Sequence, residues 1–190
     1  MQSIEVRAAG AKQASLLNRG ELIAFMGARA LDFGRLKGRE PIAIGIAANI
    51  DRFRSYNDHQ GFARGDQVIA LAKRTIWQTL EEWIPERLRI ATGAAVALAI
   101  SGGDFLTIAL HPEDCSHDIA RAIFQGLQAT QISNEHPEAR VNNPLSFSAG
   151  YSAGPAPAPD SIARIVEEAD RALYRAKSTG GNQLLPFDAE

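Results

Sequence analysis

Apolar residues along the chain fall into two patterns: short runs and helically spaced stripes. Short runs that are wholly apolar, or that alternate with polar residues, are typical of β-strands. Five such segments predict strands, at residues 41–48, 94–100, 105–110, 145–153 and 183–187. A Gly-containing turn separates the second segment from the third, which predicts a β-hairpin.

Apolar residues spaced three and four apart predict helices. Such stripes occur over residues 16–36, 66–83 and 114–129 and in a last segment that ends at Gly180-Gly181. Asp160 or Ser161 is the expected cap of the last helix, because short polar side chains accept hydrogen bonds from the first helical amides. Asp66 follows a glycine at the predicted start of its helix, so capping alone is one explanation for it.

Helices and strands alternate along the chain, with the hairpin in the middle. This order predicts an α/β fold, a two-layer sandwich in which a mixed central sheet is flanked by helices. The 190 residues, 45% of them hydrophobic, suffice for one domain with a substantial core. The weak patterning of residues 1–14 indicates an N-terminal lead or linker remnant, and residues 135–144 are expected to form a polar loop.

Composition narrows the classes of function. A net charge of −2 gives no electrostatic reason to expect nucleic-acid binding. Cys115 is the single cysteine, so no internal disulfide can form, and a cytoplasmic location is expected. No apolar run reaches the roughly 18 residues of a transmembrane helix, and the N-terminus lacks a signal-peptide pattern, so no membrane contact is expected.

The predicted hairpin carries the first candidate chemistry. Gly102 and Gly103 form its turn, and Asp104 follows them at the tip, where a carboxylate can face a ligand or a metal. The alternative is an ordinary turn with a solvated aspartate, since Gly-Gly-Asp is a common turn string.

Polar residues at the end of the strand at residues 41–48 form a second block, Asn49-Ile50-Asp51-Arg52-Phe53-Arg54-Ser55-Tyr56-Asn57-Asp58. Gly61 and Gly65-Asp66 follow, ahead of a helical pattern. A third block runs from Asp170 to Asn182 and contains Lys177. Each block has a simpler explanation: Asn57-Asp58 as a turn, Arg54 as a surface cation, and Lys177 as a cation near a helix C-terminus.

These blocks, together with Leu16-Leu17-Asn18-Arg19, resemble four motifs of the GGDEF domain, the catalytic domain of bacterial diguanylate cyclases. They occur in the family's order and spacing and cover residues 15–186. The resemblance assigns residues 15–190 to one GGDEF-like domain with the palm-like fold of nucleotide cyclases. It also implies that two GTP molecules are condensed into cyclic di-GMP by a dimer, with Mg²⁺ bound at each site.

The resemblance carries over residue by residue. It implies that Asn57 and Asp66 read the guanine, and that Phe53, Arg54, Gly102, Gly103 and Lys177 surround the nucleotide. Asp104 is the implied metal ligand and, in an active enzyme, the catalytic acid. The backbone of Ile50 and the carboxylate of Asp51 are weaker metal candidates.

The departures concentrate in the metal and phosphate half of the site. Asn49 stands where the family has its metal-binding aspartate, and a neutral amide is a weaker ligand for Mg²⁺ than a carboxylate. Phe105 and Gly181 stand where the family has a glutamate and a phosphate-binding arginine. The guanine-reading half is retained.

Three functions follow as hypotheses. The first is a degenerate, catalytically inactive domain that acts as a regulatory or guanine-nucleotide-binding module in cyclic di-GMP signalling. GTP is then its ligand, Mg²⁺ contributes weakly, and the partners are other domains of a longer signalling protein or a second copy of the chain. The second is a weakly active diguanylate cyclase that uses Asp104 and Asp51. The third is a pure interaction module with an empty site.

Overall fold

The computed structural model describes residues 2–8, 11–15, 19–130 and 145–188. Within these residues a seven-stranded sheet has the strand order β2-β1-β4-β5-β3-β6-β7. Neighbouring strands are antiparallel, except that β7 runs parallel to β6. The strands are β1 (Gln2–Ala8), β2 (Ala11–Ser15), β3 (Ile42–Ile50), β4 (Ala95–Ser101), β5 (Asp104–His111), β6 (Phe147–Pro155) and β7 (Leu184–Pro186).

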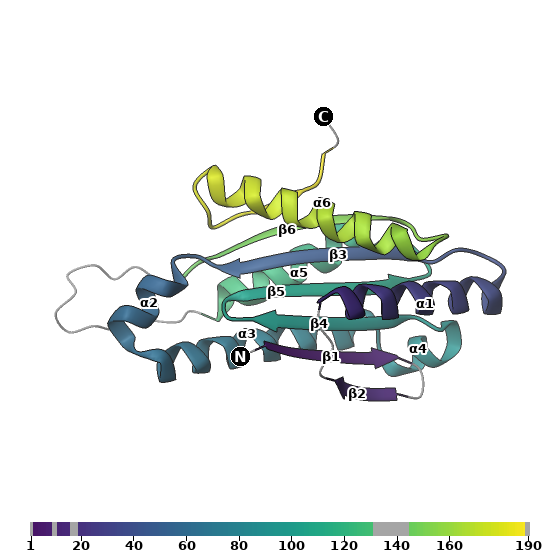
Figure 1. Ribbon diagram of the computed structural model, residues 1–190, viewed down its shortest axis with the longest axis horizontal. Coiled ribbons are helices and arrows are strands. Elements are labelled where there is room, and N and C mark those ends of the chain that lie inside the picture. The colour runs from purple at the N-terminus through teal and green to yellow at the C-terminus, as the bar shows by residue number, and fades with distance from the viewer. Residues whose placement is uncertain (1, 9–10, 16–18, 131–144, 189–190) are drawn as a thin grey trace.

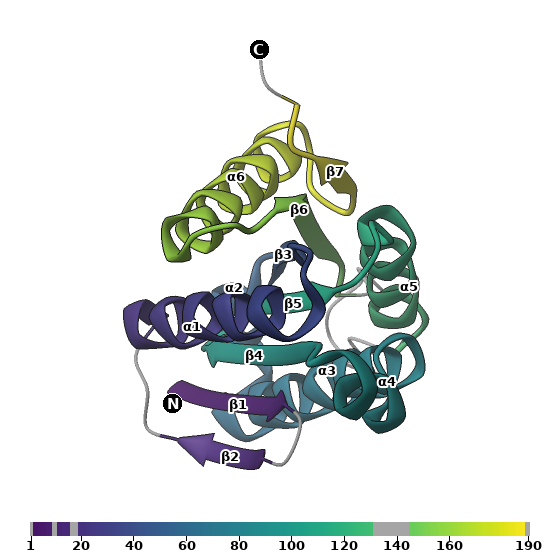
Figure 2. The same ribbon diagram turned by 90° about the vertical axis from the view of Figure 1, so that its right-hand side faces the viewer.

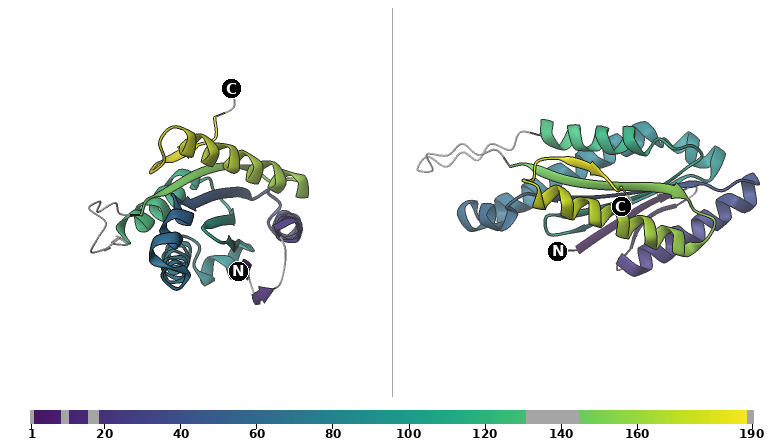
Figure 3. Two further views of the ribbon diagram at one scale, coloured as in Figure 1. Left: turned by 60° about the vertical axis from the view of Figure 1, so that its left-hand side comes forward. Right: turned by 90° about the horizontal axis from the view of Figure 1, so that it is seen from above.

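Helices cover both faces of the sheet (Figures 1 and 2). The helices are α1 (Arg19–Lys37), α2 (Phe53–Gln60), α3 (Phe62–Trp83), α4 (Glu86–Thr92), α5 (Ser116–Ala129) and α6 (Pro159–Ser178). Viewed from above in Figure 3, α1 and α6 lie along one side of the sheet, and α3 and α5 lie along the other. The α/β class with a mixed, helix-flanked sheet is therefore confirmed.

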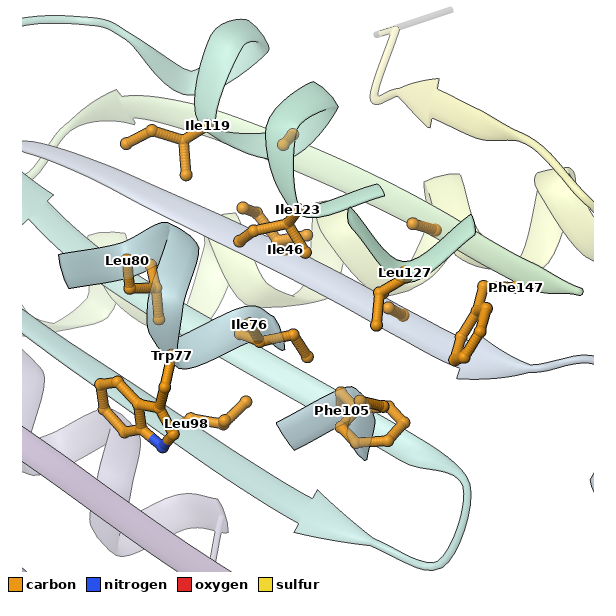
Figure 4. Packing of buried hydrophobic residues seen from close by; sticks show 14 of the residues in the cluster. Ile46, Ile76, Trp77, Leu80, Leu98, Phe105, Ile119, Ile123, Leu127 and Phe147 are labelled. Atoms are coloured by element: carbon orange, nitrogen blue, oxygen red, sulfur yellow. The ribbon is translucent and has the colours of Figure 1, made fainter. Parts of the chain in front are cut away.

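Alternation along the strands divides the core between the two faces. In β5, Leu106 and Ile108 pack with apolar side chains of α1 and α6. Phe105 and Ala109 belong to the cluster on the opposite face, with side chains of α3 and α5. Figure 4 shows Phe105 within this second cluster. Both faces of the central strands are apolar because helices exclude water from both.

Helix α6 approaches the sheet closely because of a glycine. A Cβ placed on Gly150 of β6 would lie 2.1 Å from the backbone nitrogen of Leu173. No side chain fits in that space, so the small residue fixes where α6 crosses β6. The C-terminal end of α6 is thereby held beside the ends of β3 and β6.

Several local predictions were wrong. Residues 1–14 were expected to be a lead or linker remnant, but residues 2–8 and 11–15 form β1 and β2 at one edge of the sheet. Helix α4 was not predicted. Helix α3 begins at Phe62, so Asp66 lies inside the helix and does not cap it. The residue that caps α6 is Ala158 and provides no side-chain hydrogen bond.

The hairpin at Gly102-Gly103 and the short final strand β7 are confirmed. The expected loop at residues 135–144 lies outside the described residues. Among the residues that are described, no helix combines the length and the apolar character needed to cross a membrane.

Candidate functional site

The predicted site residues gather at one end of the sheet. The end of β3, the β4–β5 turn, α2 and the C-terminus of α6 meet there (Figure 1). Backbone hydrogen bonds fix the end of β3 between its neighbours: Ile50 N donates to Gly103 O at 3.0 Å, and Asp51 N donates to Ser146 O at 2.9 Å. Residues from three of the sequence motifs are thus brought together by the fold.

Asn49 and Asp104 face each other across β3 and β5. They are register partners, and the Asn49 side-chain amide donates a hydrogen bond to the Asp104 carboxylate at 2.5 Å. An ionised acceptor makes this a charge-assisted hydrogen bond, which is stronger than a neutral one. The only carboxylate at the hairpin tip therefore already has a donor from its own chain.

Phe105 does not enter this site. Strand residues alternate between faces, so Phe105 points away from Asp104 and is 2% exposed in the core (Figure 4). The resemblance puts Phe105 at the position of a glutamate in the metal and phosphate half, so the expectation that its ring lies in the site was wrong. What it does is fill space between the sheet and α3, where it stabilises the fold.

Asp51 has a different task from the metal binding considered for it. Its carboxylate accepts hydrogen bonds from the hydroxyls of Ser146 and Ser148, each at 2.7 Å, and from the backbone N–H of Asn182 at 3.0 Å. These donors belong to the segment leading into β6, to β6 and to the turn after α6. Asp51 therefore ties three segments together.

These observations decide how well the residues fit Mg²⁺. The ion prefers several oxygen ligands, with carboxylates among them. Asp51 is committed to three donors, and Asn49 presents a neutral amide whose nitrogen points at Asp104. In the part of the chain that the structure describes, no cluster of three or more metal-ligating side chains occurs. Asp104 and the Ile50 carbonyl alone do not fit a tightly held magnesium ion.

Two charged residues near this end of the sheet, Arg19 and Asp170, were not predicted to have a role. Arg19 of α1 donates a hydrogen bond to the carboxylate of Asp170 in α6. Burial raises the pKa of Asp170, Arg19 opposes that rise, and the negative charge of Asp104 adds to it. Asp104 and Asp170 therefore share one electrostatic environment. Both Arg19 and Asp170 belong to the motifs that resemble those of the GGDEF domain, so their place in these motifs could have pointed to a role at the site.

The two residues expected to read the guanine lie in α2 and α3. Asn57 lies in α2, and its side-chain oxygen is buried without a hydrogen-bond partner in the described structure. This oxygen lies only 2.0 Å from the position that a Cβ on Gly65 would occupy, so the two helices are in close contact. Asp66 is the next residue of α3 and is exposed. The structure thus brings Asn57 and Asp66 to neighbouring positions.

Phe53 connects the two halves of the site. Its ring lies 3.0 Å from the position of a Cβ on Gly103 and 3.1 Å from that of a Cβ on Gly65. It also stacks on Tyr56, with ring centroids 6.4 Å apart and planes at 10°. Gly102 has a φ of 57° and provides the left-handed turn that the hairpin needs.

The two cations that were expected near the nucleotide, Lys177 and Arg54, are both exposed. Lys177 lies in the last turn of α6, and Arg54 lies in α2. Gly181, at the position of the family's arginine, has a φ of 74°, and a Cβ there would lie 3.2 Å from Asp51. This turn is shaped for a residue without a side chain.

The structure defines an α/β domain with its polar site at one end of a mixed sheet. The family model described as "Diguanylate cyclase, GGDEF domain" matches residues 32–183. The chain therefore belongs to the GGDEF domain family.

Named relatives agree with this assignment. The chain is 27% identical over 144 residues to the diguanylate cyclase VdcA of Vibrio cholerae, covering 75% of this chain and 38% of that protein. It is 26% identical over 181 residues to the diguanylate cyclase DgcZ of Escherichia coli, covering 91% of this chain and 54% of that protein. The chain thus spans about half or less of the length of these relatives.

Solved structures show the same fold. The GGDEF domain of DgcB from Caulobacter crescentus, solved in complex with c-di-GMP, superposes with a TM-score of 0.65 at 20% identity. The match covers 96% of this chain and 98% of that one. The GGDEF domain of the Pseudomonas aeruginosa protein TpbB or YfiN gives a TM-score of 0.62 at 23% identity, with 92% and 91% covered.

Proposed function

We propose that this chain is a degenerate GGDEF domain, a guanine-nucleotide-binding regulatory module of bacterial cyclic di-GMP signalling that makes no product itself. The observation that carries the proposal is the hydrogen bond from Asn49 to Asp104. Phosphoryl transfer depends on positioning and on neutralising charge, largely through metal ions. A site in which the hairpin carboxylate is held by a neutral amide, and in which Asp51 already accepts three hydrogen bonds, lacks the ligands for that task.

Nucleotide binding rests on the other half of the site. The side-chain oxygen of Asn57 is buried and has no hydrogen-bond partner among the described residues, and the exposed Asp66 follows Gly65 on the adjoining helix. Asp66 accepts from the N–H donors of guanine, and Asn57 both donates and accepts. Adenine presents a different pattern and would leave these groups unpaired. Lys177, Arg54 and the hairpin glycines complete the nucleotide environment, and Mg²⁺ contributes little.

A weakly active diguanylate cyclase is the second candidate. It is favoured by Asp104 and Lys177, which remain at the same end of the sheet as the base-reading residues. In either case the chain would act with other domains of a longer cytoplasmic protein, or with a second copy of itself.

Product analysis separates the two candidates. The protein is incubated with GTP and Mg²⁺ for hours, and the nucleotides are resolved by chromatography. We expect less than one cyclic di-GMP per protomer. Several turnovers per protomer would contradict the regulatory proposal and support the cyclase. A calorimetric titration with GTP and with ATP, in magnesium and in chelator, then measures binding separately, and a preference for GTP that chelator leaves intact is expected.

A further inference from the structure

Gly65 stands where a side chain would collide with the base-reading asparagine. A Cβ built on it would meet the Asn57 side-chain oxygen at 2.0 Å, the Asn57 Cγ at 3.0 Å and the Phe53 ring at 3.1 Å. Gly65 is buried in the first turns of α3 with its N–H donating to Gly61 O. The missing Cβ therefore creates the space in which the Asn57 amide lies.

Helix formation gives no reason for a glycine here, since Ala is the better helix former. Its backbone conformation gives none either, because Gly65 is not among the residues with positive φ. What remains are the contacts with Asn57, the closer of the two, and with the Phe53 ring. The oxygen of the Asn57 side chain is buried and unpartnered in the described structure, and an unpaired buried polar group costs free energy, so packing stability does not explain why this space holds a polar atom.

We infer that Gly65 is a positioning residue for base recognition. By leaving out a Cβ, it holds the Asn57 amide against α3, beside Asp66, in the orientation that meets the edge of a guanine. Phe53, which touches the same position, limits how far Asn57 can turn within the space. This inference rests on the proposed guanine binding and adds a determinant of specificity that itself makes no contact with the base.

The test substitutes Gly65→Ala in the full chain, with Gly34→Ala as the matched control. Gly34 is also helical, but a Cβ there meets no atom closer than 3.9 Å. Calorimetry with GTP and with ATP is run on each protein in chelator. We expect Gly65→Ala to weaken GTP binding about tenfold, the equivalent of one hydrogen bond. ATP binding should hardly change, and Gly34→Ala should bind both nucleotides like the parent.

A double-mutant cycle shows whether Gly65 acts through Asn57. Asn57→Ala removes the two Asn57 atoms that the added Cβ would meet and leaves the Phe53 ring, so Gly65→Ala in that background should cause no further loss of GTP affinity. This double variant also serves if Gly65→Ala alone folds poorly. Additive losses, or GTP selectivity retained by Gly65→Ala, would overturn the inference while guanine binding stands. A parent chain that binds GTP and ATP equally would instead overturn the proposed function, and with it the ligand assigned to Asn57.

Discussion

Replacing Asn49 with aspartate should make the stability of the domain depend on Mg²⁺. In the parent, the Asn49 amide donates to Asp104 at 2.5 Å. Asn49→Asp removes that donor and places two carboxylates opposite each other on β3 and β5. Without metal the two charges repel, and with metal they become two anionic ligands for one ion.

The magnitude follows from distance and exposure. Two unit charges about 4 Å apart interact by about 4 kcal/mol at an effective dielectric of about 20. Because Asp104 is exposed, water screens much of this, and we expect a loss of about 1–2 kcal/mol in chelator. Magnesium at 100 times its dissociation constant would return about 2.7 kcal/mol. Urea unfolding followed by circular dichroism, in chelator and in magnesium, measures both effects.

The swapped variant, Asn49→Asp with Asp104→Asn, is the matched control. It keeps one carboxylate and one amide on the same two strands, so we expect its free energy of unfolding, like that of the parent, to be the same in magnesium and in chelator. If the parent gained as much stability from magnesium as Asn49→Asp, the amide would not be what weakens metal binding. If Asn49→Asp were indifferent to magnesium, the pair would not be a metal site at all.

Three further predictions concern the surroundings of this pair. Asp51→Ala removes the acceptor of three hydrogen bonds and should lower the free energy of unfolding by about 2–4 kcal/mol in urea, whereas a loss below about 1 kcal/mol would mean that the serines find other partners. Gly181→Arg places a side chain at a φ of 74°; it should lower stability by about 1 kcal/mol or more and yield no cyclic di-GMP by chromatography, and a gain of product would refute this. The pKa of Asp170 is raised in the folded protein, so its contribution to stability is lost as the pH rises through that pKa. Over that pH range the melting temperature of Asp170→Asn should therefore rise relative to that of the parent. A relative fall would show that the ion pair with Arg19 outweighs burial.

The elements that could be predicted from the sequence are those with strong local patterns. The hairpin followed from two apolar runs around Gly102-Gly103, and the final helix from its regular stripe. By contrast, β1 and β2 lie in a weakly patterned segment whose pairing partner, β4, is about 90 residues away. Local pattern contains no information on such a partner. Helix α4 is only seven residues long and directly follows a proline, which was interpreted as the end of a helix.

Site residues were predicted as a set but not in their contacts. The resemblance to the GGDEF domain placed Asn49 and Asp104 together, and the structure adds that they are hydrogen-bonded to each other. Phe105 was expected at the site because it stands at the position of a glutamate in the family. Side chains of successive strand residues point to opposite faces, so Phe105 and Asp104 cannot both face the site. The strand predicted at residues 105–110 was enough to exclude this arrangement.

Asp51 shows why a motif residue has to be interpreted through its contacts. Considered as a free carboxylate two residues from Asn49, it is a natural substitute for the aspartate that the family has at position 49. In the structure its oxygens accept hydrogen bonds from two hydroxyls and one amide, which come from the segment before β6, from β6 itself and from the turn after α6. Turning it toward a metal would remove the acceptor of the Ser148 O–H, a buried donor, at a cost of about 1–3 kcal/mol, and would leave that hydroxyl only the bond that its oxygen accepts from Asn182 N. Asp51 therefore preserves the shape of this end of the sheet, whatever chemistry the site carries out. The hydrogen bonds of Asp51 explain its place in the motif by folding, so its presence does not support catalytic activity.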